Sequence, residues 1–273
     1  MSDDLTVQID RAAAYGDGVF ETIAIRNGAA RFWPAHVSRL QTGCMRLGLQ
    51  APAAEKLAAL LSAELSANAG IAGFATARLV ASAPNSPRGY RRSADTKPDL
   101  SIQLDTARPL ASELMTDGVE VRICTLRLAI QPALAGVKSL NRLEQVLARA
   151  EWQDAATFEG LTLDTDGRLI CGTMSNVFIV KDSHLATPGI TRCGVSGVMR
   201  AELLQQLQEN GLACDVRDIH GDELPKASEV FLTNSQFGVL PVKRIDSIEF
   251  EVGDVTRSAQ RLMAIAGVEE CQV

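Results

Sequence analysis

A lysine in an apolar setting is the residue of this chain best suited to covalent chemistry. Lys138 follows the apolar stretch LAGV and comes just before a segment with helical character. Partial burial lowers the pKa of a lysine and frees its amine to form a Schiff base with a carbonyl compound. A surface lysine in a loop is the more common reason for such a residue, so Lys138 alone does not define a site.

Two further motifs carry groups that bind phosphate in other proteins. GVSGVMR, residues 194–200, is a glycine-rich turn that opens a helix, so the free amides of Val198 and Met199 are candidate phosphate donors. TNS, residues 233–235, follows the strand-like EVFL and places hydroxyl groups at a strand end. Ordinary turn chemistry also accounts for each motif.

Two other motifs fit either a substrate site or purely local structure. PRGY, residues 87–90, lies in a loop, and the planar guanidinium of an arginine suits a carboxylate, although a solvated arginine is the simpler reading. Asn141 and Glu144 stand three residues apart at the start of the helix predicted after Lys138. This spacing matches a capping box, which closes a helix start without any catalysis.

The predicted helices and strands that must position these residues are arranged differently in the two halves of the chain. In the first half, apolar periodicity and turn residues predict strands and helices in separate runs, at 18–26 (strand), 34–47 and 54–69 (helices), and 74–83 and 100–104 (strands). Asn27 and Gly28 predict a hairpin turn after the first strand. We therefore expect an α+β fold with a small domain of residues 1–112 and a larger domain of residues 113–273.

In the second half, strand-like segments alternate with helices. The predicted elements are a strand at 119–130, a helix at 141–152, strands at 160–163 and 177–181, a helix at 198–209, strand-like pieces at 212–219, 229–233 and 240–250, and a helix at 254–266. The phosphate-binding candidates therefore lie at a helix start and at a strand end, which are suitable places for a ligand site.

Composition narrows the function classes. The net charge is −6 and the Lys and Arg residues are scattered, which argues against a nucleic-acid or anionic-membrane surface. No stretch approaches roughly 18 uninterrupted apolar residues, so we expect no membrane span. Six dispersed cysteines without a Cys-x-x-Cys pair, and only three histidines, predict reduced thiols and no metal site. The polar, acidic start is no signal peptide, so we expect a cytoplasmic protein.

Taken in order, the motifs carry a resemblance to a known group. The strings are YGDGVFET, HVSRL, KSLNRLEQ, MSNVF, GVSGVMR and EVFLTNSQFGVLPV, within residues 10–242. Together they resemble the pyridoxal-phosphate (PLP) enzymes of fold type IV, which include branched-chain and D-amino-acid aminotransferases and aminodeoxychorismate lyases. The resemblance implies a small α/β sandwich domain followed by a larger domain with a β-barrel-like core.

The resemblance also implies a role for individual residues. Lys138 would bind PLP covalently, Asn176 would border the cofactor, and its phosphate would be bound by Arg39, Val198, Met199 and Ser235. Cys171 stands where the group usually has a glutamate that keeps the pyridine nitrogen protonated. A neutral thiol makes a weaker electron sink, which disfavours transamination more than a lyase reaction.

Within the group, KSLNRLEQ together with RGY is most similar to the aminodeoxychorismate lyases, whose products are 4-aminobenzoate and pyruvate. The implied substrate is a small dianion, for which the candidate binding residues are Arg78, Arg88, Tyr90 and Asn141. The loop that carries Arg88 and Tyr90 reaches the neighbouring subunit's site in this fold, so a homodimer is implied. Two alternatives stay open: an aminotransferase of the same fold, and a non-catalytic PLP-binding protein.

Overall fold

A four-stranded antiparallel sheet forms the first lobe of the computed structural model, which describes residues 10–71, 73–85, 89–93 and 95–272. Its strands lie in the order β2-β1-β3-β4, with bounds Ala29–Ala30, Gly18–Arg26, Phe74–Ser82 and Asp99–Thr106. Asn27 and Gly28 both have positive φ, as a tight two-residue hairpin requires, so the predicted turn is confirmed.

Alternation along β1 gives the first sheet two different faces. Ile23 and Ile25 are fully buried with Leu40 of α2 (Trp33–Arg46) and Leu57 of α3 (Ala54–Ala67), which lie against this sheet. Phe20 and the residues two apart from it point to the opposite face, because successive side chains of a strand alternate. This second face is turned toward the other lobe.

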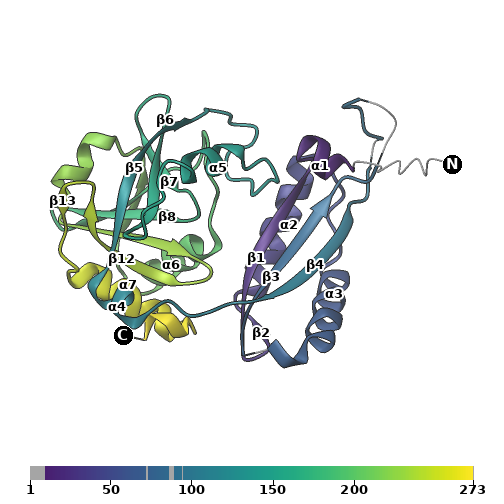
Figure 1. The fold of residues 1–273 in the computed structure, drawn as a ribbon, viewed down its shortest axis with the longest axis horizontal. Helices are drawn as coiled ribbons and strands as arrows, with labels where there is room; N and C mark the ends of the chain where they lie inside the picture. Colours follow the sequence, from purple (N-terminus) through teal and green to yellow (C-terminus); the bar gives the residue numbers. More distant parts are fainter. Residues whose placement is uncertain (1–9, 72, 86–88, 94, 273) are drawn as a thin grey trace.

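A nine-stranded mixed sheet forms the second lobe and curls around its own core (Figure 1). Eight strands lie in the order β10-β9-β8-β11-β12-β5-β6-β7, and β13 pairs with β12. In chain order the bounds are β5 Val119–Leu128, β6 Thr157–Asp164, β7 Leu169–Gly172, β8 Asn176–Lys181, β9 His184–Pro188, β10 Cys214–Arg217, β11 Glu229–Asn234, β12 Gly238–Ile245 and β13 Ile248–Glu249. The architecture confirms the expected α+β fold, with a second lobe built on a curled sheet.

Helices complete the second lobe and carry several site residues at their ends. They are α4 Ser112–Asp117, α5 Leu143–Arg149, α6 Val198–Glu209 and α7 Asp254–Ile265, with 3-10 helices η2 Gly221–Lys226 and η3 Glu269–Cys271; in the first lobe a short helix α1 Arg11–Tyr15 and η1 Ala69–Ile71 are also present. In the part of the chain that the structure describes, no helix is both long and apolar enough to cross a membrane.

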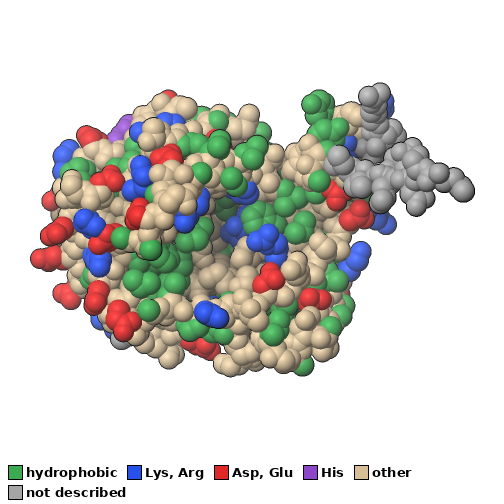
Figure 2. Space-filling view, in the orientation of Figure 1, with side chains coloured by type: hydrophobic (Ala, Val, Ile, Leu, Met, Phe, Trp, Pro, Cys, Tyr) green, Lys and Arg blue, Asp and Glu red, His purple; other side chains and the backbone are tan. Residues whose placement is uncertain are grey.

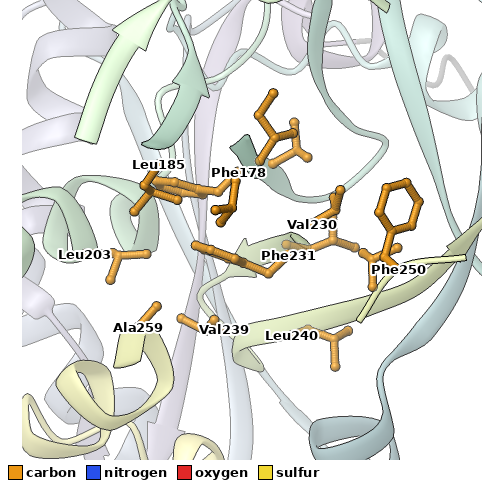
Figure 3. Close-up of a cluster of buried hydrophobic side chains, with 14 of the residues drawn as sticks. Phe178, Leu185, Leu203, Val230, Phe231, Val239, Leu240, Phe250 and Ala259 are labelled. Atoms are coloured by element: carbon orange, nitrogen blue, oxygen red, sulfur yellow. The ribbon is translucent and has the colours of Figure 1, made fainter. Parts of the chain in front are cut away.

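Aromatic stacking lies at the centre of the second lobe. The rings of Phe178 on β8 and Phe231 on β11 are stacked, with centroids 4.9 Å apart and planes only 9° from parallel (Figure 3). Leu203 of α6 and Ala259 of α7 belong to the same buried cluster. The two helices therefore rest on the strands whose ends carry the phosphate-binding candidates.

Three expectations differ from the structure. The helix predicted at 141–152 covers only Leu143–Arg149, and the capping-box interpretation is wrong. The Asn141 amide instead donates to the Gly16 carbonyl, and Glu144 accepts from the Ala129 amide. Strands β7 and β9 were not predicted, because each consists of a run of four buried residues, with one exposed residue before it in β9, and such a run has no readable alternation. The first sheet ends before α4 and the second begins after it; the domain division after residue 112 stays a prediction.

The stacked pair Phe178 and Phe231 should contribute strongly to the stability of this lobe. Phe231→Ala removes a fully buried ring and its stacking contact with Phe178, and we expect a loss of about 3–5 kcal/mol in the free energy of unfolding. Ile265→Ala, at a position 83% exposed on α7, should change it by no more than about 0.5 kcal/mol. Chemical denaturation measures both, and equal losses would contradict this account of the core.

Candidate functional site

The segment that carries Lys138 is held by backbone hydrogen bonds to both lobes. The Phe20 amide of β1 donates to the Lys138 carbonyl at 3.0 Å. On the other side, the Gly136 amide donates to Gly194, and the Ser196 amide donates to Gly136, at 2.9 and 3.1 Å. Gly136 has φ +79°, and a Cβ there would lie 2.8 Å from the Ser196 hydroxyl oxygen, so a side chain does not fit.

The Lys138 amine lies in a setting that disfavours its charge. Burial lowers its pKa to about 8, and the positive charge of Arg39 acts in the same direction. Its Nζ lies 4.3 Å from the centre of the Phe20 ring, and no described residue forms an ion pair with it. A substantial fraction of the amine is therefore neutral near pH 8, which is the form that attacks a carbonyl.

Arg39 on α2 is held by a buried carboxylate. Its Nε and Nη2 donate to the two oxygens of Glu21, and its Nη1 donates to the Ser196 carbonyl at 2.9 Å. His36 Nδ1 lies 2.6 Å from the same carboxylate. Burial acts to raise the pKa of Glu21, but the bonds from Arg39 and His36 outweigh it and lower the pKa. Two of the five guanidinium N–H groups remain for a ligand.

The start of α6 offers backbone amides to the same space. Its N-cap is Gly197, which has no side chain to bond the first amides, so those of Val198 and Met199 are free in the helix geometry. Asn176 donates to the Val195 carbonyl at 2.9 Å and fixes the turn before the helix. A Cβ at Gly197 would overlap the Asn176 amide oxygen, so glycine is required for this approach.

A cavity of about 350 Å³ collects these groups between the two lobes, in the hollow visible in Figure 2. Its lining comprises Phe20, Thr22, Arg39, Lys138, Arg142, Gln145, 171–176, 194–195, 197–199 and 233–236. Three of these residues are basic, and none of the described lining residues is acidic. The cavity is therefore electrostatically suited to an anionic ligand.

Unpaired buried atoms also point to a ligand in this cavity. Four of the cavity-lining side chains have a buried polar atom without a hydrogen-bond partner: Arg142 Nε, Gln145 Oε1, Thr233 Oγ1 and Gln236 Nε2. An unpaired buried polar group costs roughly 1–3 kcal/mol, so such groups are rare unless something binds to them. A polar ligand would satisfy both donors and acceptors here.

The cavity wall near Arg142 carries a thiol rather than a carboxylate. Burial raises the pKa of Cys171 to about 11, so its thiol is neutral at physiological pH. The buried carboxylate of Glu159 lies nearby, but it accepts from the amides of Gly160, Thr173 and Met174 and from the hydroxyl groups of Thr173 and Ser175. Glu159 therefore shapes the turn and does not replace a carboxylate at Cys171.

Comparison with known proteins places this site in a family. Residues 18–245 match the model of the family described as amino-transferase class IV. The chain belongs to the class IV aminotransferase family. Curated relatives within it differ in activity: an aminodeoxychorismate lyase of Vibrio harveyi is 37% identical, over 92% of this chain and 93% of its own. A D-alanine aminotransferase of Bacillus licheniformis is 28% identical, over 87% and 82%.

Solved structures of class IV proteins agree with the fold. The crystal structure of 4-amino-4-deoxychorismate lyase from Pseudomonas aeruginosa is 42% identical and superposes with a TM-score of 0.88, over 97% of this chain and 96% of that one. A branched-chain amino acid aminotransferase from Escherichia coli superposes with a TM-score of 0.84 at 22% identity, over 98% and 92%, which shows the shared fold.

The structure brings together one set of the predicted site residues and separates another. All seven predicted cofactor-binding residues line the cavity: Arg39, Lys138, Cys171, Asn176, Val198, Met199 and Ser235. Arg78 is exposed on β3 opposite Thr22 and does not line it. Tyr90 is exposed and Asn141 bonds Gly16, so neither lines the cavity of its own chain. Arg88 lies outside the described residues. All these roles stay predictions.

Sequence reasoning missed two groups of residues that shape the cavity. Arg142 and Gln145 were quoted within KSLNRLEQ but given no role; their spacing of three residues at a helix start places both on one face, which is a usable signal. Glu21 was quoted within YGDGVFET without its partners. Its bond to Arg39 joins residues 18 apart on different elements, so no local pattern reveals it.

The lowered pKa of Lys138 predicts a pH dependence. Incubation with pyridoxal, followed by borohydride reduction, should modify Lys138 half-maximally near pH 8, because only the neutral amine reacts and its fraction falls below that pH. An ordinary lysine, with a pKa of about 10.4, would require a much higher pH. Peptide mass spectrometry at a series of pH values from about 6 to about 10 measures the extent of modification. A midpoint at about pH 10 would contradict a lowered pKa of Lys138.

The requirement for glycine before α6 predicts the effect of a small substitution. Gly197→Ala pushes Asn176 or the helix start away, so we expect the affinity for inorganic phosphate to fall roughly tenfold, about 1.4 kcal/mol. Gly70→Ala, where an added Cβ meets nothing within 4 Å, is the matched control. Titration calorimetry provides the comparison, and an unchanged affinity in Gly197→Ala would contradict the predicted binding of phosphate by the amides of α6.

Proposed function

We propose that the cavity binds PLP, with Lys138 as the lysine that carries it. The residues present fit this group on three counts. The amine has a lowered pKa, the free amides of α6 and the spare N–H groups of Arg39 suit a phosphate, and buried polar atoms without partners line the same space. Ser235 lines the phosphate end as well, with its hydroxyl group available.

We propose further that the chain is an aminodeoxychorismate lyase, which releases pyruvate from 4-amino-4-deoxychorismate and leaves 4-aminobenzoate, a folate precursor. The observation that carries this proposal is a cavity with three basic residues and no acidic one among those described, with neutral Cys171 in its wall. The substrate is a dianion, so a cationic cavity favours it. Similarity to two proteins named as lyases of this kind supports the same conclusion.

Residue roles in the proposed reaction follow from chemistry and position. When bound, PLP would supply an electron sink for the substrate carbon that carries the reacting nitrogen. The neutral amine of Lys138 removes the proton from that ring carbon. Arg39 and the start of α6 would hold the phosphate and so position the cofactor relative to the Lys138 amine. Cys171, being neutral, leaves the electron sink weak, which suits a reaction drawn forward by an aromatic product.

The substrate carboxylates need their own donors. Arg78, Arg88, Tyr90 and Asn141 remain the proposed residues from the sequence, and the cavity adds Arg142, whose buried Nε has no partner. Its guanidinium bonds only the Ser139 hydroxyl, at 3.2 Å, so most of its donors are available to a carboxylate. Burial lowers the pKa of Arg142, so its charge lies in a poorly solvated setting that an anion would stabilise.

A homodimer in the cytoplasm is the proposed working form. Leu143, Val146 and Leu147 of α5 are each at least 60% exposed, although they are apolar and lie next to the cavity-lining residues Arg142 and Gln145. A second copy covering this face would bury them. Tyr90 is exposed and does not line the cavity of its own chain, which is consistent with its predicted contact with a neighbouring subunit.

The lyase proposal is tested by product formation. We expect the wild type to release 4-aminobenzoate and pyruvate in equal amounts from enzymatically generated 4-amino-4-deoxychorismate, and Lys138→Ala to release neither. Lys56→Ala, a change at an exposed lysine on α3, should keep full activity. Chromatography quantifies 4-aminobenzoate, and a coupled dehydrogenase assay quantifies pyruvate.

Three other outcomes would redirect the proposal. Product formation by Lys138→Ala would remove the lysine from its proposed role. A PLP-loaded wild type that moves amino groups between amino acids and 2-oxo acids, without forming 4-aminobenzoate, would identify an aminotransferase. A wild type that binds PLP and converts no amine would favour a non-catalytic binding protein.

A further inference from the structure

A buried ion-pair cluster lies directly behind the phosphate end of the cavity. Glu270 of η3 accepts from Arg26 Nε at 2.8 Å and from Arg31 Nη2 at 2.5 Å, one arginine to each carboxylate oxygen. The three side chains are only 5–6% exposed. Arg26 lies on β1 and Arg31 just before α2, so a carboxylate of the second lobe holds two cations of the first.

The two arginines also bond the turn that lines the cavity. Arg31 Nη1 donates to the Ser235 carbonyl at 3.4 Å, and Arg26 Nη2 donates to the Gln236 carbonyl at 3.1 Å. The Gln236 side chain is bonded in turn by the Thr76 hydroxyl group, at 2.8 Å. Glu270 therefore acts on this turn only through the arginines, whose positions it fixes.

The direction of these carbonyl groups matters for an anion. A carbonyl oxygen carries partial negative charge and repels a phosphate at close range, whereas hydroxyl and amide hydrogens attract it. Because both carbonyl oxygens are bound by arginines outside the cavity, the turn is left to present the Ser235 hydroxyl group to a ligand.

The segment that carries Glu270 is held in place by buried contacts. Val268, next to η3, is fully buried, and the Cys271 thiol accepts from the Val239 amide of β12 at 3.3 Å. Arg26 is held from the other side by the carbonyls of Ile25 and Ala75 and stacks on the Phe74 ring, 3.4 Å from its centre. The ion-pair cluster thus connects η3 of the second lobe to β1 of the first lobe.

We propose that Glu270 is a positioning residue for phosphate binding: through Arg26 and Arg31 it orients the turn at residues 235–236 toward the phosphate of the ligand. This inference rests on the phosphate end of the site proposed above, and it does not depend on which reaction follows. No residue of η3 lines the cavity, so Glu270 acts only by holding the residues that position the turn.

The test separates the phosphate from the rest of the ligand. Glu270→Gln keeps the shape of the side chain and removes its charge, so we expect the Kd for PLP and for inorganic phosphate to rise roughly tenfold. The Kd for pyridoxal, which lacks the phosphate, should stay unchanged. Glu269→Gln, the exposed neighbour on the same 3-10 helix, is the matched control and should behave as wild type.

A second variant covers the case in which Glu270→Gln folds poorly. Arg31→Lys keeps the charge, but a single ammonium group does not reproduce the fork that bonds both Glu270 and the Ser235 carbonyl, so the same selective loss is expected. Equal weakening of PLP and pyridoxal would mean general loosening and would overturn the proposal, as would unchanged phosphate affinity. A wild type that binds inorganic phosphate but not PLP would refute the proposed function. The phosphate Kd of the two variants would still decide whether Glu270 positions the turn.

Discussion

The buried ion pair between Glu21 and Arg39 is the interaction on which the rest of the site depends. It fixes a cation at the boundary of the two lobes, and the third nitrogen of the same guanidinium donates to Ser196 of the second lobe. A guanidinium without this partner would be poorly oriented, and burial would disfavour its charge. Burial is the main cause of the lowered pKa of Lys138; the charge of Arg39 adds to it, and Glu21 acts in the opposite direction.

Three buried carboxylates hold parts of the cavity wall from outside it. Glu21 holds Arg39, Glu159 holds the turn after β7, and Glu270 holds two arginines behind Ser235. Because these charges face away from the cavity, the described lining has basic residues and no acidic one. A ligand therefore meets cations, neutral hydroxyl groups and amides, an arrangement that favours a phosphate and a dianionic substrate over a protonated ring nitrogen.

The sequence allowed much of the site to be predicted, because its residues stand at the ends of elements with strong local signals. Lys138, Val198 and Ser235 each lie beside a strand end or helix start, and all three line one cavity in the structure. The capping box at Asn141 failed for an instructive reason. The amide group had a tertiary partner, Gly16, and such a partner overrides a local capping preference.

The sequence by itself determined the order of most elements, the family and a set of candidate residues that line one cavity, because hydrophobic periodicity and short motifs act over a few residues. Only the tertiary structure decided which charges meet. Arg26 and Glu270 are 244 positions apart, and Thr76 and Gln236 are 160 apart. Such pairs form where the two lobes pack against one another. Which side chains meet there depends on the packing of both lobes and not on any local sequence pattern.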